Sequence, residues 1–332
     1  MTRVTIVGTT TWGTTLAILL GRKDVSSVLL TRTVDEARYL RASGENLRFL
    51  PGVPFPPALT ISARPEEALE NPELIILAVP SQKFRENLLW IRDSVKQGTV
   101  VLSATKGLEM ETGNRMSQVI EEELPSPISE SCCVLSGPNL AKEVVSGKPA
   151  STVIASKDLG AATLAQSLLM SPKFRVYTNE DVIGVELGGA LKNIIAIGSG
   201  ISDGLGYGDN AKSAFVTRGL SEITRLGEVA GANPRTFAGL AGLGDIMATC
   251  HSQLSRNRFV GEELAKGKSL EEIMSNMGNI AEGVFTASAA MDMAKSYGTD
   301  LPITSVTHRI LLGELDVVEA ISQLMGRPPR SE

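Results

Sequence analysis

The chain has 332 residues, of which 42% are hydrophobic and 21% charged, and its formal net charge is −5. These values are typical of a folded protein with a sizeable core, and the length favours two domains. The negative balance argues against a nucleic-acid or anionic-membrane surface. Two histidines and three cysteines without a C-x-x-C motif argue against a disulfide framework and predict no metal site. The first strand is expected to begin near Arg3, which leaves no room for a signal peptide and favours a cytoplasmic protein.

The first half of the chain alternates short apolar runs with amphipathic stretches. Six apolar runs are expected to be strands, at residues 4–8, 27–31, 73–80, 98–107, 132–139 and 150–156. Continuous apolar strands separated by helices indicate a parallel sheet that is covered on both faces. We therefore predict that residues 1–181 form a Rossmann-type, doubly wound α/β domain that binds a dinucleotide.

Beyond Val182 the apolar residues recur at helical spacing. Helices are expected at residues 209–230, 256–265, 281–296 and 315–325, and residues 182–332 are predicted to form an all-α domain for substrate binding and catalysis. The most apolar long stretch, residues 182–201, contains Glu186, Lys192, Asn193 and five glycines. Charged residues at that density argue against a membrane span.

The stretch VGTTTWGTT, residues 7–15, follows the first expected strand. A dinucleotide-binding loop usually reads G-x-G-x-x-G, and here Gly8 and Gly13 match its outer glycines while Thr10 replaces the middle one. Threonine hydroxyls above a helix N-terminus can bind phosphate. A plain strand-turn-helix without a ligand remains the alternative.

Other expected strands also end in polar residues or turn-forming residues. Arg32 follows the second strand, where NAD-selective domains carry an acid, so the sequence favours NADPH over NADH; a solvated arginine is the alternative. Lys106 ends the strand at 98–107, and Gly137 and Asn139 end the one at 132–139. Each of these strand ends could simply form a turn without any function, but parallel strands would bring them to one edge of the sheet.

Lys192 lies in the apolar segment GVELGGALKNIIAIGSG, residues 184–200. An unpaired buried ammonium is costly, and Glu186 is about 240° away around a helix at 100° per residue. Lys192 must therefore find a charge elsewhere in the sequence, reach solvent, or face a polar cleft. A buried lysine exchanges protons near neutral pH more readily than an exposed one, which suits acid/base catalysis.

The segment GLAGLGDIMATCHSQLSRNRFVGEEL, residues 239–264, predicts a helix capped by Ser255. Arg256 and Asn257 would lie in its first turn, beside free N–H groups that suit a phosphate or carboxylate. Asp245 precedes them after a glycine-rich turn. A capped helix with solvated arginines is the alternative.

Several blocks in this order resemble the bacterial type of NAD(P)-dependent glycerol-3-phosphate dehydrogenase. They are WGTTLA (12–17), ENLRFLPGV (45–53), AVPS (78–81), ATKGLE (104–109), SGPNLAKEV (136–144), the segment 176–220, GLAGLGDIMATCHSQLSRNR (239–258) and AEGVFTA (281–287). The resemblance covers nearly the whole chain. It implies NAD(P)H-dependent reduction of dihydroxyacetone phosphate to sn-glycerol 3-phosphate, a precursor of glycerophospholipids, by a homodimer.

The resemblance also implies roles for individual residues. Lys192 would be the general acid/base, and Lys106 would polarise the substrate oxygen or orient the substrate. The implied catalytic group is Lys192, Lys106, Asn193 and Asp245; substrate would also contact Gly137, Asn139, Ser255, Arg256 and Asn257. The implied cofactor contacts are Gly8, Thr10, Thr11, Trp12, Gly13, Arg32, Lys106, Ala141, Arg256, Ile280 and Glu282.

Two other functions remain open from the sequence. One is a related two-domain dehydrogenase that acts on an unphosphorylated hydroxy acid or ketone, and the other is a non-catalytic nucleotide-binding paralogue, suggested by Thr10. The expected proton donor and phosphate ligands are all present in the sequence, which favours glycerol-3-phosphate dehydrogenase over these two alternatives.

Overall fold

The computed structural model describes residues 2–277 and 281–329, and the chain divides into two compact units. The first unit comprises Met1–Lys106 and Asn114–Glu186, and the second comprises Gly107–Gly113 and Leu187–Glu332. That residues 1–181 bind the dinucleotide and residues 182–332 bind the substrate and carry out catalysis stays a prediction.

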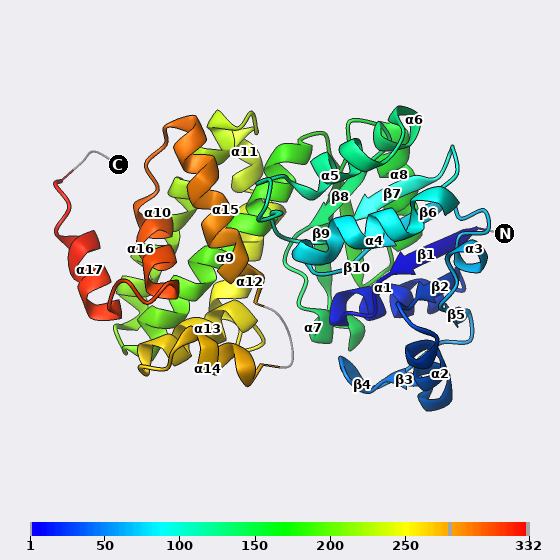
Figure 1. The fold of residues 1–332 in the computed structure, drawn as a ribbon, viewed down its shortest axis with the longest axis horizontal. Coiled ribbons are helices and arrows are strands. Elements are labelled where there is room, and N and C mark those ends of the chain that lie inside the picture. Colours follow the sequence, from blue (N-terminus) through cyan, green and yellow to red (C-terminus); the bar gives the residue numbers. More distant parts are fainter. Residues whose placement is uncertain (1, 278–280, 330–332) are drawn as a thin grey trace. The chain divides into compact units, whose positions relative to one another are not determined.

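The first unit is built on an eight-stranded sheet, coloured blue to green in Figure 1. Its strands are β1 (Arg3–Val7), β2 (Ser26–Leu30), β5 (Leu59–Ser62), β6 (Leu74–Leu77), β7 (Val100–Ser103), β8 (Cys133–Ser136), β9 (Ala150–Ala155) and β10 (Phe174–Asn179). They lie in the order β10-β9-β8-β7-β6-β1-β2-β5. Neighbouring strands run parallel except β8 and β9, which are antiparallel. The predicted doubly wound α/β fold is therefore confirmed.

Two strands of the sheet, β5 and β10, were not predicted from the sequence. They are the two edge strands, and each alternates buried with partly or fully exposed residues instead of presenting a continuous apolar run. An edge strand has solvent on one side, so its apolar signal is weaker than that of a central strand.

Helices cover both faces of the sheet. They are α1 (Thr11–Gly21), α2 (Val34–Ser43), α3 (Pro65–Ala68), α4 (Phe84–Ile91), α5 (Met116–Glu123), α6 (Ser126–Ser129), α7 (Ala141–Val145) and α8 (Leu159–Leu169), with the short 3-10 turns η1 (Ser81–Lys83) and η2 (Arg92–Ser94) and the hairpin β3 (Glu45–Asn46) and β4 (Leu50–Pro54). Alternate residues of β6 belong to two separate apolar clusters. Leu74 and Ile76 pack with α1 and α8, and Ile75 and Leu77 pack with α4 and α5.

The order of the strands reverses between β1 and β6. The chain runs from β1 outward to β2 and β5, and then returns to β6 on the other side of β1 and continues to β7 and β8. Val7 pairs with Leu77, so the carboxyl ends of β1 and β6 lie side by side. In open α/β sheets, ligands bind outside the carboxyl ends of the strands at such a reversal.

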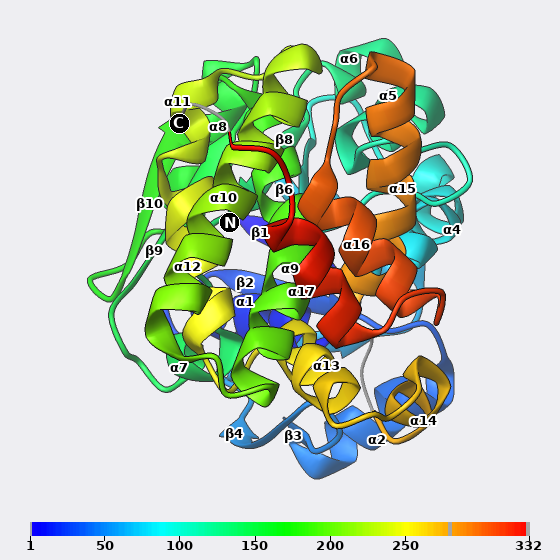
Figure 2. The ribbon, with the colours of Figure 1, turned by 90° about the vertical axis from the view of Figure 1, so that its left-hand side faces the viewer.

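The second unit is built mainly from helices (Figure 2). They are the later part of α9 (Val182–Gly204), α10 (Gly208–Val229), α11 (Pro234–Phe237), the π-helical turn η3 (Leu240–Gly244), α12 (Asp245–His251), α13 (Arg256–Ala265), α14 (Leu270–Ser275), α15 (Glu282–Tyr297), α16 (Pro302–Leu311) and α17 (Val317–Met325). The four helices predicted from the sequence are confirmed as α10, α13, α15 and α17.

Helix α9 is long and apolar enough to cross a membrane by length and composition. Within its most apolar window, however, 89% is buried inside the protein. A buried apolar helix is the core element of a folded domain, so α9 does not indicate a membrane span.

Candidate active site

The loop between β1 and α1 requires glycine at both of the positions that the sequence singled out. Gly8 has φ +109°, and a Cβ there would lie 2.7 Å from the carbonyl oxygen of Ala78. A Cβ on Gly13 would lie 2.2 Å from the carbonyl oxygen of Gly8. The loop therefore turns sharply against the end of β6 and packs α1 closely on the strand, as in a dinucleotide-binding fold.

Thr10 requires no glycine because its backbone is ordinary, with φ −60° and ψ 167°. It is the N-cap of α1, and its hydroxyl accepts a hydrogen bond of 3.1 Å from the Gly13 N–H. The same hydroxyl donates a hydrogen bond of 2.7 Å to the carbonyl oxygen of Ala78. The Thr10 hydroxyl thus contacts the loop and the end of β6.

The N-terminus of α1 fits a pyrophosphate. The first N–H groups of a helix have no partner inside the helix, and Thr10 satisfies only that of Gly13. Across the described residues, no backbone acceptor outside the helix is found for the N–H groups of Thr11 and Trp12. Two such donors at the positive end of a helix can bind an anion.

Two other predicted cofactor residues are placed on the same unit. The Trp12 ring packs edge-on against Phe174, with ring centroids 6.3 Å apart. Its buried indole N–H has no hydrogen-bond partner among the described residues. Ala141 is the first residue of α7.

The ends of β7 and β8 meet, as the sequence predicted for strand ends of one sheet. The Lys106 ammonium donates a hydrogen bond of 2.8 Å to the carbonyl oxygen of Gly137, and Asn139 donates one of 2.8 Å to the Thr152 hydroxyl. The Asn139 side-chain oxygen is buried without a partner in the described part of the chain. The role of Lys106 in polarising a substrate oxygen stays a prediction.

Arg32 lies directly after β2, but its guanidinium is engaged by α4. It forms an ion pair of 2.7 Å with Glu86 and lies 4.7 Å from the centroid of the Trp90 ring. The preference for NADPH that was based on Arg32 stays a prediction.

Sequence reasoning sought an acid at the end of β2 itself and missed Glu36. This residue lies in the first turn of α2, and its carboxylate accepts hydrogen bonds from the Thr9 hydroxyl (2.5 Å) and the Arg32 N–H (3.3 Å). The available signal was the T-x-x-E pattern from Thr33 to Glu36, which is typical of a helix N-terminus. Thr33 is indeed the N-cap of α2.

In the second unit, Lys192 is buried and paired. Its ammonium lies 2.9 Å from a carboxylate oxygen of Asp245 and donates a hydrogen bond of 2.5 Å to the Thr249 hydroxyl, which donates to the same carboxylate. Lys192 is 6% exposed and Asp245 2%, so the alternative of a lysine that reaches solvent is excluded. Glu186 instead pairs with Arg115 at 2.7 Å, and both of these residues belong to the first unit.

Asn193, the residue after Lys192, hydrogen-bonds the start of α13. Its side-chain oxygen accepts a hydrogen bond of 2.8 Å from the Asn257 amide, whose own oxygen accepts one of 3.0 Å from the Gly283 N–H. Asn193 and Asn257 are both buried. Asn193 follows Lys192 on α9, so the helix that carries the predicted proton donor is also hydrogen-bonded to the first turn of α13.

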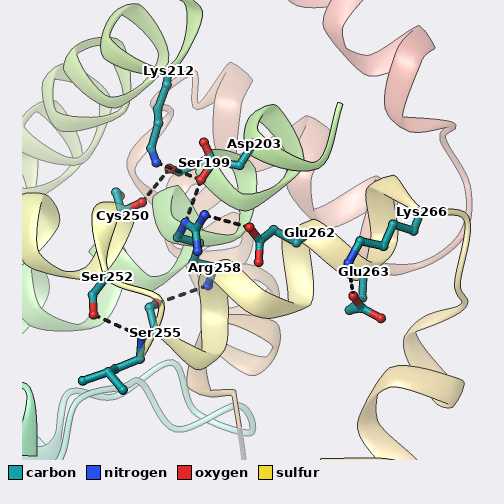
Figure 3. Close-up of polar contacts among 11 residues, drawn as sticks. Ser199, Asp203, Lys212, Cys250, Ser252, Ser255, Arg258, Glu262, Glu263 and Lys266 are labelled. Carbon is teal, nitrogen blue, oxygen red and sulfur yellow. Dashed lines mark hydrogen bonds and ion pairs between the residues drawn. The ribbon is translucent and has the colours of Figure 1, made fainter. Parts of the chain in front are cut away.

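Ser255 caps α13, as predicted (Figure 3). Its hydroxyl accepts a hydrogen bond of 3.2 Å from the Arg258 N–H, which places Arg256 and Asn257 in the first turn. Desolvation lowers the pKa of the Arg256 guanidinium, and the charge of Glu282 opposes that shift. Arg256 and Glu282, both predicted to contact the cofactor, are thus electrostatic neighbours.

The first turn of α13 also contributes to a second charged cluster, through Arg258. Asp203 on α9 forms ion pairs with Lys212 (2.8 Å) and Arg258 (2.6 Å), and Arg258 also pairs with Glu262 at 2.7 Å (Figure 3). The Arg258 side chain is committed to this cluster, so of the two arginines in the S-R-N-R motif Arg256 is the candidate phosphate ligand.

Neither cysteine nor metal chemistry is indicated in this unit. Burial raises the pKa of the Cys250 thiol to about 12, so the thiol is protonated at neutral pH. Within residues 2–277 and 281–329, no group of three His, Cys, Asp or Glu side chains could hold a metal ion. Ile280, a predicted cofactor contact, lies outside the described residues.

Comparisons with known proteins give one consistent result. Residues 3–162 match the family model described as the N-terminus of NAD-dependent glycerol-3-phosphate dehydrogenase, and residues 181–322 match its C-terminus. Glycerol-3-phosphate dehydrogenase (NAD(P)+) of Dehalococcoides mccartyi is 49% identical over 327 residues, covering 98% of this chain and 91% of the relative. The relative of that name from Chlorobium phaeobacteroides is 45% identical and covers 99% of both chains. A crystal structure of glycerol-3-phosphate dehydrogenase from Coxiella burnetii is 36% identical, with a TM-score of 0.93, and covers 98% of this chain and 99% of that one.

Proposed function

Because this chain belongs to the NAD-dependent glycerol-3-phosphate dehydrogenase family, we propose that it reduces dihydroxyacetone phosphate to sn-glycerol 3-phosphate, reversibly. It is an oxidoreductase that uses a nicotinamide cofactor. The observation that carries the proposal is the buried Lys192–Asp245 pair, on a helix whose next residue, Asn193, is hydrogen-bonded to Asn257 in the first turn that also carries Arg256.

The first unit would hold the cofactor. The turn at Gly8 and Gly13 and the N–H groups of Thr11 and Trp12 fit a pyrophosphate, and the Thr10 hydroxyl is bound to Ala78. The nicotinamide ring supplies the hydride when the cofactor is bound.

In the second unit, Lys192 would act as the general acid. Its ammonium would give a proton to the C2 oxygen of the substrate in reduction and recover it in oxidation. Asp245 and Thr249 together hold the ammonium in one position. A positive donor held in advance at a developing alkoxide lowers the barrier without reorganisation during the reaction.

The first turn of α13 would bind the substrate phosphate. Ser255 satisfies only the Arg258 N–H, and Arg256 adds a guanidinium that suits bidentate binding of a phosphate. The Asn257 side chain in this turn is held by hydrogen bonds to Asn193 and Gly283. Binding energy from a remote phosphate can be used to orient the reacting carbonyl.

Four finer points belong to the same proposal. Arg32 would supply the cation that a 2′-phosphate needs, which supports use of NADPH. We also propose that the protein works in the cytoplasm as a homodimer formed through the helical domain, and that its product feeds glycerophospholipid synthesis.

The test is an absorbance assay of NADPH and NADH oxidation with dihydroxyacetone phosphate and, separately, unphosphorylated dihydroxyacetone. We expect turnover with the phosphorylated substrate alone, and loss of turnover in Lys192→Ala with cofactor binding retained. Equal turnover of both substrates would favour a dehydrogenase for unphosphorylated compounds. Tight cofactor binding without turnover would favour a non-catalytic paralogue.

A further inference from the structure

Glu36 lies where the first unit would receive the adenosine ribose of a dinucleotide. Its two carboxylate oxygens accept hydrogen bonds from the Thr9 hydroxyl, in the loop after β1, and from the Arg32 N–H, after β2. In this fold the ribose hydroxyls are bound near the end of the second strand, beside the glycine-rich loop. Glu36 therefore supplies, from α2, the acid that the end of β2 lacks.

The position of Glu36 matters for a 2′-phosphate in two ways. Such a phosphate would need the same donors that Glu36 already occupies, the Thr9 hydroxyl and the Arg32 N–H. It would also meet a like charge at short range, and like charges brought together at a binding site discriminate against the wrong ligand. An unphosphorylated ribose, by contrast, can donate its 2′-hydroxyl to the carboxylate.

The guanidinium of Arg32 does not neutralise Glu36 in this arrangement. It is bound to Glu86 and stacked on Trp90, and Lys83 pairs with the same Glu86 at 3.1 Å. The hydrogen bond and the charge of Lys83, followed by the charge of Arg32, lower the pKa of Glu86, so this carboxylate stays charged at neutral pH. Arg32 thus has a competing anion of its own, and a 2′-phosphate would share its guanidinium with Glu86.

We propose that Glu36 is a specificity-determining residue that lowers the preference of this enzyme for NADPH over NADH. The inference rests on the proposed use of a nicotinamide dinucleotide. It explains how a chain with an arginine after β2 can still accept the unphosphorylated cofactor, because the carboxylate favours a free ribose hydroxyl while Arg32 favours a phosphate.

The experiment measures the affinities of ADP-ribose and 2′-phospho-ADP-ribose by calorimetry, and kcat/KM for NADH and NADPH with dihydroxyacetone phosphate. In Glu36→Gln we expect the ratio of affinities to move toward the phosphorylated ligand by about tenfold or more, which corresponds to loss of one like-charge contact and one charge-assisted hydrogen bond. Glu36→Ala is a second variant, and the midpoint of thermal unfolding shows that each is folded.

Asp35→Asn is the matched control. Asp35 precedes Glu36 on α2, is exposed, and pairs with Arg38 at 2.8 Å, so this variant makes the same charge change without touching the ribose position. We expect its ratio to stay within about twofold of the unaltered protein because exposed charges are screened. An equal shift in both variants, or no shift in folded Glu36→Gln and Glu36→Ala, overturns the inference.

Failure of the inference can be told apart from failure of the proposed function. Binding of the two ligands with an unchanged ratio in the Glu36 variants contradicts only the role of Glu36. Binding without turnover of dihydroxyacetone phosphate contradicts only the proposed reaction. If neither ligand binds the unaltered protein, both are wrong.

Discussion

The hydroxyl of Thr10 donates a hydrogen bond of 2.7 Å to the carbonyl oxygen of Ala78. The two residues follow β1 and β6, so the bond spans the point where the order of the strands reverses. Thr10 also caps α1 by accepting from the Gly13 N–H. A threonine in place of the usual middle glycine therefore joins the cofactor loop to the neighbouring strand.

This bond predicts that the Thr10 hydroxyl stabilises the folded protein, and that a glycine at this position would not be more stable. We expect Thr10→Val to lower the free energy of unfolding by about 1–2 kcal/mol, since it loses a helix cap and a hydrogen bond. Thr10→Ser keeps the hydroxyl and should stay close to the unaltered protein. Denaturant titrations give the free energy of unfolding of each variant, and binding titrations give its affinity for NADPH. Equal values for Thr10→Val and Thr10→Ser would show that the hydroxyl is dispensable.

The Lys192–Asp245 pair predicts a stability defect that a second substitution can repair. Asp245→Leu alone leaves a buried ammonium without its carboxylate and should cost about 3 kcal/mol or more of unfolding free energy. The double variant Lys192→Met with Asp245→Leu removes both charges and should recover much of that stability without recovering turnover. Recovery of activity in the double variant would contradict the role of Lys192.

Arg256 is predicted to bind the substrate phosphate. Arg256→Gln should raise KM for dihydroxyacetone phosphate about tenfold to a hundredfold, the range for loss of one charged hydrogen bond. Arg225→Gln is the matched control, because Arg225 is exposed on α10 and, among the described residues, hydrogen-bonds Ser221 one turn away, at 3.3 Å. Steady-state kinetics decide the point: an unchanged KM in Arg256→Gln would favour an unphosphorylated substrate.

The Asp203 cluster predicts a pH-dependent contribution to stability. Burial opposes ionisation of Asp203, but hydrogen bonds and charges from Lys212 and Arg258 outweigh it and lower its pKa below the usual value. A lowered carboxyl pKa stabilises the folded protein fully above the unfolded pKa of about 4, and that stability is lost as pH falls through the folded pKa.

Asp203→Asn tests this sign. We expect it to lower the free energy of unfolding by about 1–3 kcal/mol at pH 7, because it leaves two partly buried cations without their carboxylate. The difference from the unaltered protein should shrink as pH falls below about 4. Denaturant unfolding at several pH values measures it, and a difference that grows on acidification would refute the assignment.

Features that depend on near neighbours in the chain could be predicted without a structure. The N-cap at Ser255 and the four predicted helices depend on contacts within about one helical turn, so their patterns can be found without a structure. The central strands were equally visible as continuous apolar runs. Lys192 could be recognised as a residue in need of a partner, since its own helix offered none.

The partners of these residues, by contrast, depend on how the chain folds in three dimensions. The Lys192 ammonium reaches Asp245 on another helix, and Arg32 binds Glu86, 54 residues later in the sequence. The Thr10 hydroxyl donates a hydrogen bond to Ala78, 68 residues away in the sequence. The residue that departs from the glycine pattern therefore has a structural role of its own. Such pairs are created when packed strands and helices bring distant segments together, and no local periodicity records which segments will meet.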